Sequence, residues 1–403
     1  MKDNRTKTTP KVLLTVLLLI LYEFAGAVPV PWVDTSKLAV ISSYSLLEYM
    51  DVFNGGALST LSFTAVGISS YITASIIIQL LSAGFPFLEE LSKLPGGQKK
   101  IKKITIILGA VLSLIMSFGL VSAISKQTNI LTSDAWYVKV IIAGCHCLGT
   151  IISVWIGETI SEKGFCNGIS LLNAINVAKS IPGQISELLS FPIYKSAIII
   201  GVILVTTLFI VLLETSELRI PTTSSKAYAS GLPVESYLPI KINISGVMPI
   251  IFASTFFQLA QTIIQIIKWD APQWLLAILT YGNPFYILIS CIIIFSFTYI
   301  YSALIFKPDE IAKYLQINET AISGIRPGTD TEKLLNKKFS KINFISALYL
   351  TVLSLISMSC FLFVGYNGVQ PSSLIILIGV AIEIIQKIKI CTISSQYASL
   401  SIG

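Results

Sequence analysis

The sequence predicts an all-α protein that crosses a membrane many times. Apolar residues make up 54% of the 403 positions and charged residues only 12%, and the mean hydropathy is +0.79. A soluble domain of this size cannot bury so much apolar surface. The apolar residues also form continuous runs, as between Ser196 and Leu213, and do not alternate with polar ones as in a membrane β-barrel.

Ten segments are apolar and long enough to cross a bilayer, which takes about 20 helical residues. They are 12–28, 65–83, 104–124, 136–156, 169–189, 196–213, 245–267, 284–305, 342–364 and 372–391. Five lie on each side of the midpoint, which predicts two pseudo-symmetric five-helix halves, 1–193 and 194–403, as in many proteins that move substrates across membranes. The first segment could instead be a signal peptide, but the nine spans after it favour a retained helix.

Basic residues predict the orientation, because Lys and Arg gather on the cytoplasmic side of a membrane protein. If the N-terminus is cytoplasmic, the inner segments and inner span ends hold 22 of the 28 Lys and Arg residues. We therefore expect a multi-pass protein of the cell membrane with both termini in the cytoplasm. This orientation also accounts for the net charge of +7 without a nucleic-acid partner.

Three connections between the spans are unusually long. The outer one, near 29–64, contains a Gly-, Ser- and Thr-rich run that leads into a span. Such a run must be buried in protein or line a cavity, so it is either a re-entrant loop or a movable element in a water-filled funnel. The inner loops are 214–244 and 306–341. In the second, Pro327 and Gly328 set a turn that holds Arg326 at a loop tip, either as a partner contact or as an unpaired surface residue.

The sequence contains no motif for catalysis or energy coupling. It has no Walker loop, H-E-x-x-H or G-x-S-x-G motif, which predicts a passive conduit with no enzymatic activity and no cofactor. Cys145 and Cys147 flank His146, but successive helical residues point about 100° apart, so we interpret them as packing residues and not metal ligands. His146 is expected to be a buried hydrogen-bonding residue. Lys179 and Glu383 are the deepest charges, and an ion-coupled transporter would need such residues.

Six segments, in order along the chain, resemble the SecY/Sec61-alpha family of protein-conducting channels. The exit of the first span, LYEFAGAVPVPWVD, is similar to a pattern ending in P-x-P-G-x-D, with Trp32 in place of the glycine. The other five are GGALSTLSFTAVGISSYITASIIIQLL, WIGETISEKGFCNGIS, LPIKINISGVMPIIFASTF, GIRPG and SSQYASL. The resemblance covers nearly the whole chain and implies a clamshell of two five-helix halves around an hourglass pore.

The resemblance implies a ring of apolar side chains at the waist of that pore. Branched aliphatic side chains dewet an empty constriction, which blocks ions, yet yield to a passing chain. By position the ring is Ile68, Ile72, Asn173, Val177, Ile251 and Ile376. Asn173 departs from the aliphatic pattern, and it either lines the waist or hydrogen-bonds a neighbouring helix.

A plug and a lateral gate are also implied by the resemblance. The plug lies near 46–62 and includes Phe53, Gly55, Gly56 and Leu58. Its glycines lower helix stability by about 1 kcal/mol each, which suits a plug that moves out of the closed pore when the channel opens. The gate lies between the second and seventh helices, at Thr73, Gln79 and Leu259. An amide at mid-span, such as that of Gln79, needs a partner across this interface.

The family's partners are implied in the same way. The inner loops would dock a SecA-type motor ATPase or a ribosome through Arg219, Arg326, Pro327 and Gly328. The other implied partners are an unfolded preprotein with a signal peptide, small SecE/SecG-like membrane subunits and membrane lipid.

Two departures make the chain look like the accessory SecY of Gram-positive bacteria, which exports serine-rich glycosylated adhesins. Leu218 stands where the family usually has a second basic residue, and the tail ends soon after SSQY. The alternatives are a general housekeeping SecY, a secondary solute transporter, and an insertase-like chaperone that opens only towards lipid.

Overall fold

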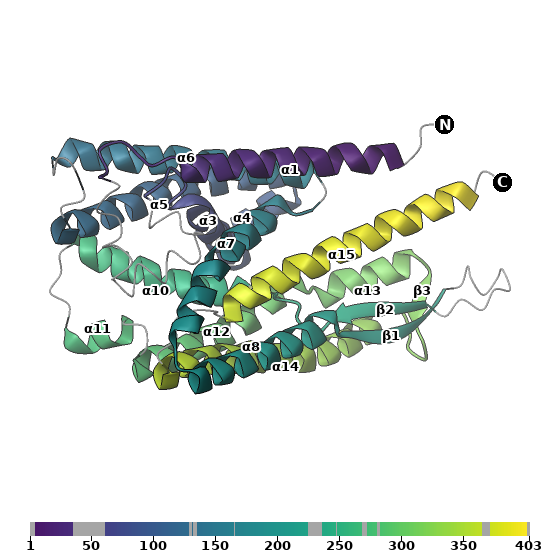
Figure 1. Cartoon of the computed structure of the whole chain (residues 1–403). Coiled ribbons are helices and arrows are strands. Elements are labelled where there is room, and N and C mark those ends of the chain that lie inside the picture. Colours follow the sequence, from purple (N-terminus) through teal and green to yellow (C-terminus); the bar gives the residue numbers. More distant parts are fainter. Residues whose placement is uncertain are drawn as a thin grey trace.

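The computed structural model consists mainly of long helices that lie side by side (Figure 1). It describes residues 5–34, 61–128, 131, 135–164, 166–224, 236–246, 248–267, 272–279, 283–364 and 371–400. Each predicted span coincides with one helix. These helices are α1 (Arg5–Ala27), α3 (Gly67–Gly84), α5 (Gly97–Thr128), α6 (Trp136–Lys163), α7 (Gly168–Ser190), α8 (Ile193–Thr215), α10 (Met248–Ile267), α12 (Pro284–Ile305), α14 (Thr329–Val364) and α15 (Pro371–Leu400). Within the described residues, six helices are long and apolar enough to cross a membrane by length and composition.

Several helices extend beyond the apolar segments that predicted them. The largest difference is in α14, which begins at Thr329 although its apolar part was expected from residue 342. Hydropathy marks only the part of a helix that suits lipid, whereas backbone hydrogen bonds continue through a polar first turn. Shorter helices lie in the connections, namely α4 (Pro86–Lys93), α11 (Gln273–Leu279) and α13 (Pro308–Ile317).

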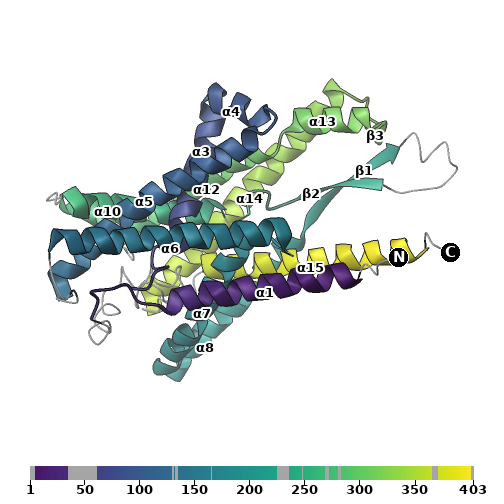
Figure 2. The same ribbon diagram turned by 90° about the horizontal axis from the view of Figure 1, so that it is seen from above.

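The two long inner loops fold together into one antiparallel sheet. Its strands are β1 (Glu217–Ser224), β2 (Ser236–Lys241) and β3 (Thr320–Ile322), in the order β2-β1-β3. Strand β1 pairs with β2 of the same loop and with β3 of the other loop. The sheet and α13 lie at the same end of the molecule as the start of α1 and the end of α15 (Figures 1 and 2).

The helices before and after residue 193 pack largely within two groups. Helices α1, α3, α5, α6 and α7 contact one another, and α12 contacts α10 and α14. Helix α15 contacts both α7 and α8, while α10 contacts α3 and α5 across the two groups. The division into halves at 193/194 stays a prediction, with which these contacts agree.

At three positions among the helices before residue 193, the backbone either approaches its neighbour very closely or has a positive φ. A Cβ on Gly149 would lie 1.8 Å from the carbonyl oxygen of Phe63, and one on Gly168 would lie 2.0 Å from that of Gly157. Only glycine permits these approaches of α6 to its neighbours. Trp32 has a φ of 63°, in the left-handed region that favours glycine, at the position where the family pattern has glycine.

Two pairs of buried polar residues join α5 to α6 by hydrogen bonds. His146 is fully buried, and its Nδ1 lies 2.6 Å from the Oγ of Ser117. Ser113 and Thr150 form a second pair between the same two helices, α5 and α6, at 2.8 Å. The interpretation of His146 as a buried hydrogen-bonding residue is therefore confirmed.

Candidate functional site

Four helices bring the expected pore-ring residues into two adjoining apolar clusters. In the first, Ile68 and Ile72 of α3 are buried against partly buried Ile251 of α10. In the second, Val177 of α7 and Ile376 of α15 are buried, again with Ile251 packed against them. Ile251 belongs to both clusters, so the five aliphatic side chains form one continuous apolar contact between the two groups of helices.

Asn173 lies on α7 one helical turn before Val177, which places the two residues on the same face. Its side chain is only 7% exposed. Within the part of the chain that the structure describes, its amide has no hydrogen-bond partner. By contrast, the nearby Asn176 is hydrogen-bonded to the Tyr22 hydroxyl of α1, at 3.0 Å. Of the two alternatives for Asn173, this arrangement favours the pore waist over a bond to a neighbouring helix.

At the expected lateral gate, Gln79 has a partner on a different helix from the one predicted. Its Oε1 accepts a hydrogen bond from the Tyr301 hydroxyl of α12 at 2.8 Å, while its Nε2 donates to Ser75 of its own helix. Thr73 is buried and donates to the Ser69 carbonyl within α3, so it does not bridge the interface. Leu259 belongs to α10, and its side chain falls outside the described residues.

The predicted plug residues Phe53, Gly55, Gly56 and Leu58 lie outside the described residues. The segment that follows them is bonded to the exit of α1. The backbone N–H of Val30 donates to the Leu61 carbonyl at 3.1 Å, and that of Phe63 donates to the Val28 carbonyl at 3.0 Å. Leu61 is buried in a cluster with residues of α5 and α6, so the chain is firmly held immediately before α3 begins.

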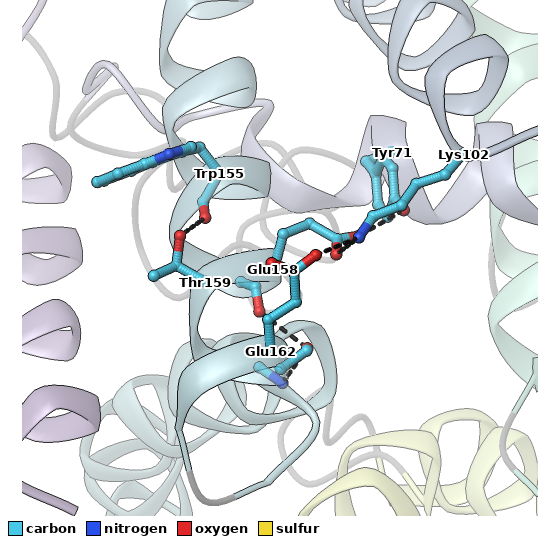
Figure 3. A network of polar contacts seen from close by, with 9 residues as sticks. Tyr71, Lys102, Trp155, Glu158, Thr159 and Glu162 are labelled. Atoms are coloured by element: carbon cyan, nitrogen blue, oxygen red, sulfur yellow. Dashed lines mark hydrogen bonds and ion pairs between the residues drawn. The ribbon is translucent and has the colours of Figure 1, made fainter. Parts of the chain in front are cut away.

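A polar network that the sequence analysis did not predict joins α3, α5 and α6 (Figure 3). Glu158 accepts a hydrogen bond from Tyr71 at 3.2 Å and forms an ion pair with Lys102, which also lies 3.3 Å from Glu162. Tyr71 is the residue before Ile72 of the ring. The signal was present in the motif WIGETISEKG, whose Glu158 and Glu162 are four residues apart and therefore lie on one face of α6.

The deep charges Lys179 and Glu383 both have structural partners. Lys179 forms an ion pair with Glu23 of α1, and its Nζ lies 5.9 Å from the centre of the Tyr22 ring. Glu383 of α15 accepts from the backbone N–H of Asn167, the N-cap of α7, at 3.4 Å. An ion-coupling site would need charges that bind and release an ion, so these pairings disfavour the solute-transporter alternative.

The predicted docking residues lie at the end of the molecule where the sheet is. Arg219 of β1 is exposed, with its guanidinium 2.8 Å from the Glu217 carboxylate and 4.8 Å from the centre of the Tyr237 ring. The hydrogen bond to Glu217 raises the pKa of this guanidinium, which is charged at physiological pH in any case.

Arg326 stands directly before the turn that starts α14. Its side chain is exposed and has no partner among the described residues. Its carbonyl accepts from the Thr331 hydroxyl at 2.9 Å, and Gly328 has a φ of 106°, a conformation that other residues rarely adopt. The turn Pro327–Gly328 is thus fixed, and it presents the guanidinium to solvent.

Comparison with known proteins supports the resemblance. The SecY family matches residues 62–385. The protein translocase subunit SecY of Helicobacter pylori (strain 26695) is 32% identical over 97% of this chain and 97% of its own length. The protein translocase subunit SecY 2 of Lactobacillus kefiranofaciens is 30% identical, over 95% of this chain and 98% of its own. A solved structure of a protein-conducting channel, 16% identical, covers 96% of this chain and 92% of its own, with a TM-score of 0.68.

These matches extend over almost the full chain and include the helices that carry the expected ring residues. The fold is therefore the SecY-like all-α membrane fold, and the protein is a channel subunit of the cell membrane, not an enzyme. The chain belongs to the SecY family of protein translocase subunits.

Proposed function

We propose that this chain is the central pore-forming subunit of a preprotein translocase, and that unfolded chains pass through the ring formed by Ile68, Ile72, Asn173, Val177, Ile251 and Ile376. The observation that carries the proposal is the meeting of the five aliphatic residues of this set, from four helices, at one apolar contact. An aliphatic constriction excludes ions when dry and yields to a side chain of any kind. Signal segments would leave sideways into lipid between α3 and the pair α10 and α12.

The proposed orientation places the N- and C-termini in the cytoplasm. It is supported by the excess of Lys and Arg in the inner segments, which follows the positive-inside rule. It is also supported by the position of the sheet at the same end as the start of α1 and the end of α15. The sheet, α13 and the Arg326 turn would then all face the cytoplasm.

The proposed partners follow from this orientation. A SecA-type motor ATPase would dock on the sheet at Arg219 and on the turn at Arg326, Pro327 and Gly328, since exposed arginines on rigid elements suit recognition of an acidic surface. Small SecE/SecG-like subunits and lipid would cover the apolar outer faces of the helices. Residues such as Leu204, which is 64% exposed, need such a cover.

Among SecY proteins, we propose the accessory type, which exports serine-rich glycosylated adhesins. One support is that β1 has apolar Leu218, paired with Ile240, at the position where the family usually has a second basic residue. The other is the match to a SecY 2 protein at 30% identity. General SecY subunits match at a similar level. Deleting the gene tests the assignment: export of the adhesin should stop while general secretion continues, and a general secretion defect would make the chain a housekeeping channel.

Cysteine cross-linking tests the pore itself. All six native cysteines are first replaced by serine, and single cysteines are then placed at Ile72, Val177 and, as a lipid-facing control, Leu204. A preprotein with one cysteine, stalled during transport in reconstituted vesicles, should form disulfides with the first two positions and not with the third. Cross-links at Leu204 equal to those at the ring, or none at the ring, would refute this path.

A further inference from the structure

Asn243 occupies the centre of a buried polar node on the chain between β2 and α10. Its side chain is 5% exposed. Its Nδ2 donates to the Glu214 carboxylate at the end of α8. Its Oδ1 accepts from Ser245 and from Ser346 of α14, both at 3.2 Å. One amide therefore joins the entry of α10 to two other helices.

The node lies where the sheet is connected to the pore helix. Strand β2 ends at Lys241, and the backbone N–H of Ile242 donates to the Ser216 carbonyl at 3.2 Å, directly before β1. Helix α10 begins at Met248. Its residue Ile250 is buried against α8, α12 and α14, while Ile251 packs in both ring clusters. Asn243 is thus close along the chain both to the sheet and to the ring.

We infer that Asn243 is a positioning residue that holds the entry of α10 to α8 and α14, so that a displacement of the sheet is passed on to α10 and its ring residue. Without this anchor the segment between β2 and α10, which contains Gly246 with a φ of 60°, would lose its side-chain bonds to α8 and α14, and a displacement of the sheet would rotate the backbone locally. The inference rests on the proposed function, since it assumes that a motor acts on the sheet.

The test compares two buried asparagines in the complete, reconstituted translocase. Asn243→Ala removes the anchor. Asn343→Ala is the matched control, because Asn343 is also buried and donates to the Tyr299 carbonyl but lies outside the node. Motor binding to the vesicles and preprotein transported per ATP are both measured. Asn243→Ala removes three hydrogen bonds, so we expect it to lower the transport per ATP by at least about threefold, the factor for one lost membrane hydrogen bond, with motor binding and the control unchanged.

A second pair of variants separates the anchor from general destabilisation. Glu214→Gln keeps an acceptor for Asn243 and should behave as the wild type, whereas Glu214→Ala should reproduce the loss. If Asn243→Ala does not fold, Ser346→Ala, which removes only the bond to α14, should give a smaller fall in the same ratio. Unchanged coupling in Asn243→Ala, or an equal fall in Asn343→Ala, would overturn the inference. A wild-type channel that transports nothing would instead overturn the proposed function.

Discussion

The hydrogen bond between Tyr301 and Gln79 offers the smallest perturbation of the proposed gate. It is a side-chain hydrogen bond between α3 and α12, at 2.8 Å, and thus joins the two groups of helices. Tyr301→Phe removes only the hydroxyl and leaves the ring of the side chain in place. If the gate opens between these helices, the bond exists only in the closed state, and its loss favours opening.

The size of the effect follows from hydrogen bonds measured in membranes, which contribute about 0.6 kcal/mol on average and about 1.7 kcal/mol at most. Because about 1.4 kcal/mol changes an equilibrium tenfold, the ratio of open to closed channels should rise about threefold to sixteenfold. Gln79 is exposed and also donates to Ser75. Its amide therefore has other hydrogen-bond partners when Tyr301 is replaced, and we expect an effect near the threefold end of this range.

The assay is transport of a preprotein with a defective signal peptide, whose entry depends on spontaneous gate opening. Tyr301→Phe should increase it about threefold, and Gln79→Ala should do the same. The double variant should show no further increase, since both changes remove one bond. Tyr299→Phe, on the same helix with its ring 42% exposed, is the control. A result in which Tyr301→Phe equals Tyr299→Phe would refute the gate role.

Three further predictions concern the docking turn and the ring. Arg326→Glu should reduce export at least about tenfold at a normal protein level, because like charges in an interface cost several kcal/mol; quantitative secretion measures this. Ile376→Asn should increase ion leak and transport of preproteins with defective signals, because an unpaired amide costs about 1–3 kcal/mol in a dry seal; vesicle conductance measures the leak. Asn173→Ile should lower the resting conductance without loss of thermal stability in detergent, since its amide lacks a partner among the described residues.

Each of these predictions has a result that would contradict it. Normal secretion by Arg326→Glu would remove that residue from the docking surface. Unchanged leak and unchanged signal discrimination in Ile376→Asn would mean that the ring lies elsewhere. A fall in the melting temperature of Asn173→Ile by itself, with conductance as before, would show that the amide bonds a neighbouring helix.

The helices were predictable because lipid imposes a simple composition on them. A segment such as 284–305 is predicted to the residue, since α12 begins at Pro284 and ends at Ile305 where the apolar run does. The start of α14 was not predictable in this way. Its first turns contain Asp330, Glu332 and Lys333, which suit water, and hydropathy does not distinguish a polar helix from a polar loop.

The sheet and the gate bond were missed for a different reason. Strand β3 is three residues long, and it forms because β1 offers it a partner from a distant part of the chain; no local pattern encodes that pairing. Gln79 was predicted to need a partner across the interface, and it has one. That the partner is Tyr301 of α12 and not a residue of α10 depends on the tertiary packing of the helices, which the sequence pattern does not specify. The expected ring is different again: the family resemblance proposes its residues, while the packing of its five aliphatic side chains against one another shows only in the structure.

The pairing of β1 with β3 has a consequence for biosynthesis. During synthesis on the ribosome, β1 and β2 emerge early and are able to form a hairpin by themselves. The third strand follows only after α10, α12 and α13 have been made, because Thr320–Ile322 lies beyond them in the chain. A half-made protein therefore cannot display the finished three-stranded sheet. The surface proposed for motor docking is complete only after most of the helices have been made.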